Sequence, residues 1–348
     1  LLKVQAASAG DQVAMGLGIA AATAGNNNTS VAMSVSGGVI TNTTAASVLD
    51  SSVNQRAGQS QGIAVTAYDR SRTLLGGGSF SLATGGNGSA TSAGGSLVLA
   101  VQKNKLSADW LGSTASGFNR LDVSANSAAR LLAGALAVAV TTGQNSNSAS
   151  GAISLVIVDN DVRAKVDKSD AGDSSLTGAE VNVNAQSVTG LSALDGLFSQ
   201  AGLTALSHTE LDLDGAQTTQ QIDGGIDTQD DLFAEDGSTT GNTTEQKLFS
   251  GQIAGEAVLA IAGNVAASSG KTSVGGAVSV VYTGSDYTAS LANTEVDLTG
   301  DLSVNAGNST DVLAAAIGAA GAKENAVSGS ATAVVARGSI NANVDMTG

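Results

Sequence analysis

The residues with the clearest capacity for chemistry are carboxylates that cluster in one part of the chain. Residues 205–247 contain Glu210, Asp212, Asp214, Asp223, Asp227, Asp230, Asp231, Glu235 and Asp236. Hard cations such as Ca²⁺ take clustered carboxylate and carbonyl oxygens as ligands. Asp212, Asp214, Asp223 and Asp227 are therefore candidate calcium ligands, and calcium is the one cofactor that the sequence suggests. The terminal Glu of a calcium loop and the calcium-binding nonapeptide are both absent, so a solvated acidic loop remains the alternative.

Catalytic interpretations of the same region are less well supported. Paired carboxylates such as Asp212 and Asp214 could serve glycoside hydrolysis. Those sites usually include aromatic platforms for the sugar, and Trp110 is the only tryptophan. His208 is the only histidine, so a Ser-His-Asp triad would have to use it, whereas a polar loop histidine is the simpler interpretation. We therefore expect no enzyme activity and assign no catalytic residue.

Composition excludes several further classes. The 348 residues include no cysteine, which rules out disulfides, thiolate zinc sites and iron–sulfur clusters. A net charge of −15 argues against nucleic acid, whose binding depends on Lys and Arg. No apolar run of about 18 residues predicts a membrane-spanning segment. The chain starts with Leu1 and lacks a signal-peptide pattern, so we expect it to be part of a longer polypeptide.

The elements that must position these residues recur along the chain. An alternating apolar strand with a central Val and a final Ala appears at residues 2–6, 63–67, 121–125, 181–185 and 302–306. The central valines, starting at Val4, are 61, 58, 60 and 121 residues apart, so the last interval is twice the period. Self-similarity at a fixed period indicates a repeat architecture.

A second phrase has the same period. A polar residue is followed four positions later by Ala and six positions later by an apolar residue, beginning at Asn42, Asn104, Asn160, Ser285 and Gly338. Trp110 takes the apolar position of this phrase and is expected to be a packing residue. We divide the chain into a single array of units of about 60 residues: 1–62, 63–120, 121–180, a divergent 181–241, 242–301 and a partial 302–348. Residues 205–247 are expected to form an acidic surface excursion.

The repeated runs alternate with period two and are rich in Val, Ile and Thr, which predicts strands. The chain contains no proline, as expected if nearly every strand is interior to a sheet. A unit that cannot bury its own apolar face must stack on its neighbours, so the sequence predicts an all-β, parallel β-solenoid (β-helix). Similarity at one third of the period is not apparent, which favours one broad, flattened coil per unit over three narrow coils.

At the two phrases the sequence resembles the repeats of giant bacterial surface adhesins of the leukotoxin and filamentous-haemagglutinin type. The matching segments are 181–187, 151–158 and 160–166. The resemblance covers nearly the whole chain except residues 205–247. It implies a right-handed solenoid in a secreted or cell-surface stalk, filament or adhesive fibre, and it transfers no catalytic residue.

These observations lead to a functional expectation. We expect a non-catalytic, structural or adhesive segment of an extracellular bacterial fibre, with a host cell, surface or glycan as its ligand. A calcium- or glycan-binding module is the alternative, and a carbohydrate-active β-helix enzyme is a further one. Residues 137–140, 155–158 and 258–262 are apolar on both faces, which indicates a doubly covered sheet or contact between copies. We therefore expect self-association, side by side or end to end.

Overall fold

The structure is a computed structural model that describes residues 2–8, 10–23, 27–54, 62–86, 88–187 and 256–346, and these residues form strands and no helix. The strands belong to three sheets with parallel pairing. The seven-stranded sheet contains β1 (Leu2–Ser8), β4 (Ser52–Asn54), β5 (Gly62–Asp69), β8 (Thr114–Ser127), β12 (Ser174–Ser187), β16 (Thr294–Leu298) and β17 (Leu302–Gly307). The five-stranded sheet contains β2 (Asp11–Ala22), β6 (Arg72–Thr84), β9 (Arg130–Thr142), β13 (Glu256–Ser268) and β18 (Thr310–Gly321). The eight-stranded sheet contains β3 (Asn27–Leu49), β7 (Ser89–Leu111), β10 (Asn145–Val158), β11 (Asp161–Asp167), β14 (Thr272–Thr283), β15 (Asp286–Ala292), β19 (Asn325–Ala336) and β20 (Ile340–Asp345).

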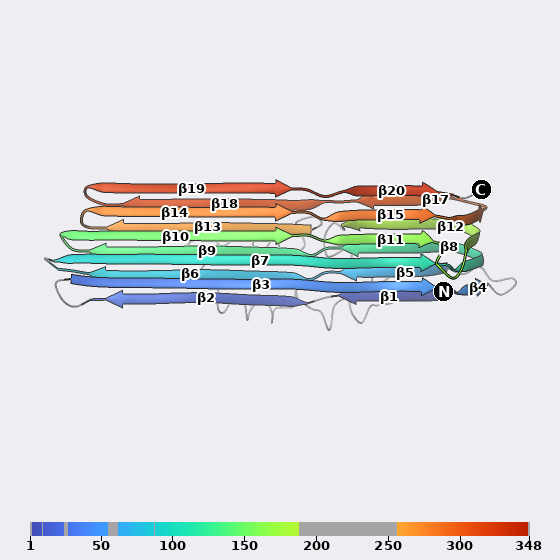
Figure 1. Cartoon of the computed structure of the whole chain (residues 1–348), viewed down its shortest axis with the longest axis horizontal. Helices are drawn as coiled ribbons and strands as arrows, with labels where there is room; N and C mark the ends of the chain where they lie inside the picture. Colours follow the sequence, from blue (N-terminus) through green and yellow to red (C-terminus); the bar gives the residue numbers. More distant parts are fainter. Residues whose placement is uncertain are drawn as a thin grey trace, which may run out of the picture.

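The chain visits the three sheets in a fixed order. From the seven-stranded sheet it enters the five-stranded sheet, crosses to the eight-stranded sheet and returns, as in β5, β6, β7 and β8. Figure 1 shows β1 and β2 end to end, as are β5 and β6, while β3 and β7 run the other way across the same width. The passes stack from the N-terminal, blue end to the C-terminal, red end. The fold is thus all-β with parallel sheets, which is compatible with the predicted β-solenoid.

Equivalent residues of successive passes lie side by side. Val4 pairs with Val65, Val65 with Val123, Val123 with Val183, and Val183 with Val304. The prediction that these valines form one column is therefore confirmed. Each pass advances the sheet by one strand, a step of about 4.8 Å, so successive passes form successive layers.

The pairing differs from the predicted division at one point. Val183 and Val304 are direct partners although 121 residues separate them, so the doubled interval corresponds to one step in the sheet. The division into 181–241 and 242–301 assumed two steps there, and the described strands contain one. Ser187 pairs with Ser127, and Ala257 pairs with Arg130. In the order of strands, residues 188–255 therefore fall between β12 of the seven-stranded sheet and β13 of the five-stranded sheet.

The corner from the eight-stranded to the seven-stranded sheet uses a repeated local device. Asp50, Gly112 and Asn293 have φ values of 46°, 54° and 45°, a conformation that Gly, Asn and Asp tolerate best. The next residue then donates its hydroxyl to the carbonyl two positions before it, in each case at 2.8 Å: Ser51 to Leu49, Ser113 to Leu111 and Thr294 to Ala292. Local side-chain to backbone bonds of this kind favour a turn over continued sheet.

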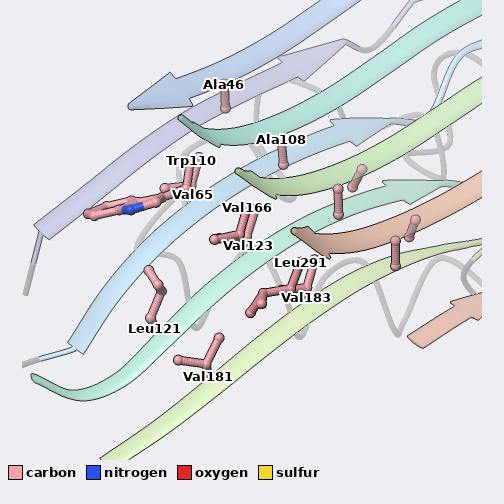
Figure 2. Close-up of a cluster of buried hydrophobic side chains, with 14 of the residues drawn as sticks. Ala46, Val65, Ala108, Trp110, Leu121, Val123, Val166, Val181, Val183 and Leu291 are labelled. Carbon is pink, nitrogen blue, oxygen red and sulfur yellow. The ribbon is translucent and has the colours of Figure 1, made fainter. Parts of the chain in front are cut away.

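The interior contains two apolar clusters. The first lies between the seven-stranded sheet and the second half of the eight-stranded sheet, and Figure 2 shows Val65, Val123 and Val183 within it. Trp110 also belongs to this cluster, is fully buried and donates from Nε1 to the Ser113 carbonyl at 3.0 Å. Its predicted packing role is thereby confirmed. The second cluster lies between the five-stranded sheet and the first half of the eight-stranded sheet, and most of its members are Ala and Val.

Small residues let the five-stranded sheet and the first half of the eight-stranded sheet approach each other closely. A substitution at Gly94 tests this close approach. An added Cβ at Gly94 would lie 2.8 Å from the carbonyl oxygen of Val138 on the opposite layer. Because that oxygen belongs to backbone, Gly94→Ala is expected to lower the free energy of unfolding by about 1–3 kcal/mol. Chemical denaturation followed by Trp110 fluorescence measures the change.

The adjacent Gly95 is the matched control, because its added Cβ would meet only the Met33 side chain at 3.8 Å. Gly95→Ala is expected to be neutral or to stabilise the protein by up to about 1 kcal/mol. Equal destabilisation by both variants would contradict the close approach at Gly94.

Candidate interaction surface

The predicted site residues lie outside the part of the chain that the structure describes. This applies to the candidate calcium ligands Asp212, Asp214, Asp223 and Asp227, and to His208. Calcium binding by these residues stays a prediction. Within the described ranges, no group of three or more His, Cys, Asp or Glu side chains could hold a metal ion.

The most polar part of the described interior joins the two apolar clusters. Asp69 is buried and accepts a hydrogen bond from Asn104 Nδ2 at 2.6 Å, and Ser71 Oγ lies 3.2 Å from the same nitrogen. The backbone amide of Asn104 donates in turn to the side-chain oxygen of Asn160 at 3.1 Å. Asn42 repeats this contact one strand away, donating its amide to Asn104 Oδ1 at 3.3 Å. Buried polar groups need such partners, and these stack the passes rather than face a ligand.

A small cavity lies at the first pass, close to this polar interior. Its volume is about 90 Å³, well below the roughly 300–1,000 Å³ of typical ligand pockets. It is lined by Ser8, Gly10, Gln12, Ile40, Asn42, Ser71, Arg72 and Thr73. The cavity is too small to hold an oligosaccharide, and its volume is that of a site for a few water molecules.

The outer face of the eight-stranded sheet offers a much larger surface, and its first half is apolar. One outward column consists of Val35, Leu97, Ile153, Val278 and Ala331, which pair in register. Val35, Leu97 and Ile153 are 68%, 38% and 47% exposed. Three neighbouring outward columns begin at Val31, Gly37 and Val39 and are apolar in the same way. We call these four columns the apolar face.

The five-stranded sheet is apolar on its outer side as well. Leu17, Gly78, Leu136, Gly263 and Ile317 form one outward column in which large and small residues alternate. The side chains lean across the glycines: a Cβ added at Gly78 or Gly263 would lie 3.3 Å from the leucine of the preceding pass. The two-sided apolarity predicted from residues 137–140, 155–158 and 258–262 therefore corresponds to buried inner side chains and, at Val138, Ile157 and Ile261, partly or fully exposed outer ones.

The second half of the eight-stranded sheet has a charged outer side. Its ion pairs are Lys103 Nζ with Asp159 Oδ2 at 3.4 Å, Arg163 Nε with Asp161 Oδ1 at 2.7 Å, and Lys165 Nζ with Asp167 Oδ2 at 2.8 Å. The cations of these pairs are 45–62% exposed, and ion pairs at the surface contribute roughly 0.2–1 kcal/mol each. The face is thus divided lengthwise into an apolar half and a charged half. Sequence reasoning noted the apolar strands but missed this division, which the alternation of Lys, Arg and Asp over residues 159–167 could have revealed.

Two carboxylates of the charged half titrate differently. Burial raises the pKa of Asp109, although a hydrogen bond from Ser107 and the charges of Lys165 and Arg163 partly offset it. Burial acts the same way on Asp167, but there the hydrogen bonds from Lys165 and Asn293, the Lys165 charge and the Lys168 amide prevail. They hold the pKa of Asp167 below its ordinary value.

No protein-family model, curated protein or solved structure matches this chain. Within the described ranges there is also no helix with the length and hydropathy to cross a membrane. The geometry of the outer faces therefore carries the functional argument.

Because the pKa values of Asp167 and Asp109 shift in opposite directions, we expect their amide variants to change the free energy of unfolding at pH 7 in opposite directions. The folded-state pKa of Asp167 is lowered, so its contribution to stability is present above the unfolded-state pKa and is lost as the pH falls. Asp167→Asn is expected to lower the free energy of unfolding at pH 7 by about 0.2–1 kcal/mol. The difference from the parent protein should disappear in acid, below the folded-state pKa.

Asp109→Asn is the matched variant. The folded-state pKa of Asp109 is raised, so its ionised form costs stability at neutral pH. The amide variant is expected to be more stable than the parent protein at pH 7, and the gap should close as Asp109 becomes protonated. Urea denaturation at a series of pH values measures both. A loss of stability at pH 7 in both variants would contradict the assigned pKa direction of Asp109.

Proposed function

We propose that this chain is a structural segment of a large fibre that a bacterium secretes or displays on its surface. In this proposal the segment is a right-handed parallel β-solenoid of units of about 60 residues, and it has no catalytic role. The fixed order of the three sheets and the in-register pairing of Val4, Val65, Val123, Val183 and Val304 support it. A rod built in this way carries load and presents long side faces.

The single observation that carries the proposal is the apolar face. Monomeric soluble proteins rarely expose contiguous apolar patches larger than a few hundred Å², and larger patches mark interaction sites. Here the apolar positions repeat in every described pass, so the patch grows with each layer that is added. A surface that lengthens with the rod suits a partner that runs alongside it.

We infer that this partner is a second copy of the rod. The apolar face is built from strands with regular spacing, so two such faces match along their whole length. The charged half beside it would orient the copies, because charges at a rim set register more than affinity. The resemblance to surface adhesins supports attachment to a host cell or other surface as the role of the assembled fibre.

Lateral association can be tested by placing charge on the apolar face. The variant Val35→Lys, Leu97→Lys and Ile153→Lys adds three ammonium groups at outward positions of one column. Because burying unpaired charges in an interface is costly, this variant is expected to weaken self-association by at least about tenfold. Sedimentation velocity over a concentration series, with electron microscopy of the assembled species, measures the effect.

The control variant Thr43→Lys, Ser47→Lys and Ser107→Lys adds the same charge on the charged half of the same sheet. It is expected to leave association within about threefold of the parent protein. A parent protein that stays monomeric at all accessible concentrations would refute lateral assembly, as would an equal loss of association in both variants.

A further inference from the structure

The outer side of the five-stranded sheet is apolar across all five strands. Ala135 and Ala137 of β9 point into the second apolar cluster, so by alternation the residues between and beyond them point outward. Four outward columns cross the sheet, and their first residues are Met15, Leu17, Ile19 and Ala21. Every residue of these four columns is apolar or glycine. We call the four columns the back face.

The polar residues of the same strand segments lie on the inner side. Ser79, Ser81 and Asn264 are the polar residues within the spans that the back face covers, and all three are buried. Ser81 Oγ donates to Ser30 Oγ at 2.9 Å, and Asn264 Nδ2 donates to Ser150 Oγ at 2.9 Å. A sheet with one solvated side normally places its polar residues on that side. The reverse arrangement found here indicates that the outer side contacts another surface.

The back face is open both at its edges and in its middle. Leu17 and Ile317 are 74% and 63% exposed, and Phe80 and Val265 are 40% and 41% exposed. Single exposed apolar residues are common on protein surfaces, whereas a contiguous patch of them marks an interaction site.

The size of the back face suits a contact between proteins. Each of the five strands contributes about 4.8 Å and each column about 6.6 Å, so the face measures about 24 by 26 Å. Covering it removes about 600 Å² from water on each partner, or about 1,200 Å² in total. That total is the lower end of the range for stable interfaces, and each further pass would increase it.

The back face and the apolar face lie on opposite sides of the second apolar cluster. Two copies joined through their apolar faces alone would leave both back faces in water. A contact between the back face of one copy and the apolar face of the next uses both surfaces in every copy of a series. Contacts of this heterologous kind do not close into a dimer unless a rotation accompanies them.

The other half of the rod fits the same arrangement. The outer side of the seven-stranded sheet carries a fully polar column, which consists of Gln5, Thr66, Ser124, Asn184 and Asn305. Stacking two copies without rotation places this polar side over the charged half of the neighbour and the back face over the apolar face. No charged half then meets an apolar surface, which avoids the cost of desolvating unpaired charges.

We propose that copies of this rod stack front to back, with the back face of one copy packed on the apolar face of the next. The inference rests on the lateral association proposed above. It keeps a second copy as the partner of the apolar face and specifies that this copy contributes its back face. The result is an open series of parallel rods, whereas pairing of two apolar faces would stop at a dimer.

Charge placed on the back face tests the second surface. Ile19→Lys, Phe80→Lys and Val265→Lys add three ammonium groups to one outward column whose residues at these positions are 69%, 40% and 41% exposed. This back variant is expected to weaken association at least about tenfold, as the apolar-face variant does. Sedimentation velocity measures it, and the charged-half variant is again the control. The parent protein is expected to form species larger than dimers as its concentration rises.

Mixing the two variants tests the arrangement itself. The apolar-face variant keeps an intact back face, and the back variant keeps an intact apolar face. Front-to-back contact therefore predicts that the mixture forms heterodimers with an affinity within about threefold of the parent contact, although each variant alone stays monomeric. Heavy-isotope labelling of one variant and native mass spectrometry identify these heterodimers.

Buried Trp110 reports whether each variant has folded, because its emission should match that of the parent protein. If the back variant fails this check, Ile19→Thr, Phe80→Thr and Val265→Thr replace it, since Thr suits strands. This milder variant is expected to weaken association at least about threefold.

The outcomes separate this inference from lateral association in general. A folded back variant that associates like the parent protein would overturn front-to-back stacking and leave pairing through the apolar face intact. A mixture of folded variants that stays monomeric would also overturn it. A parent protein that stays monomeric would refute both proposals, and one that instead floats with phosphatidylcholine vesicles would assign the back face to lipid.

Discussion

The structure depends on parallel backbone pairing between passes that are far apart in sequence. Every strand of the described ranges finds its hydrogen-bonding partner in an adjacent pass, typically about 60 residues away, and not in the strand that precedes it. A single pass would therefore bury little and pair with nothing. Because each layer stabilises the next, any residue that blocks one step of the ladder affects the layers on both sides of it.

This constraint explains the unusual composition. Two layers can close around a thin interior only if the inward side chains are small, and the clusters consist mainly of Ala and Val, with Gly94 at a point of close approach. Where the interior must be polar, the same logic holds. Asn104 bonds along the stack to Asn42 and Asn160, so one polar column serves several passes. One large aromatic ring fits beside a glycine: a Cβ added at Gly178 would lie 2.5–2.6 Å from ring atoms of Phe118.

Much of the fold was predictable from the sequence, because in a parallel stack equal residues occupy equal environments. The Val column and the role of Trp110 followed directly from the repeated phrases. The insertion was harder to place, because an interval of 121 residues fits two regular steps as well as one step with added chain. Only the pairing of Val183 with Val304 distinguishes them. The division of the outer face into apolar and charged halves was also missed, since it depends on which side of each strand faces out. The proposed calcium ligands lie in residues 205–247, where the repeated phrases are absent, so the sequence provides no spatial arrangement for these carboxylates.

The corner at Ser187 has a consequence for engineering and evolution. The ladder continues from Ser127 to Ser187 and from Arg130 to Ala257, and dozens of extra residues separate Ser187 from Ala257 in the sequence. The register on both sides is therefore indifferent to the length of the sequence that the corner carries. A foreign domain inserted at this position would leave the strand register unchanged. Equivalent corners in other layers offer the same kind of insertion point for displaying such a domain.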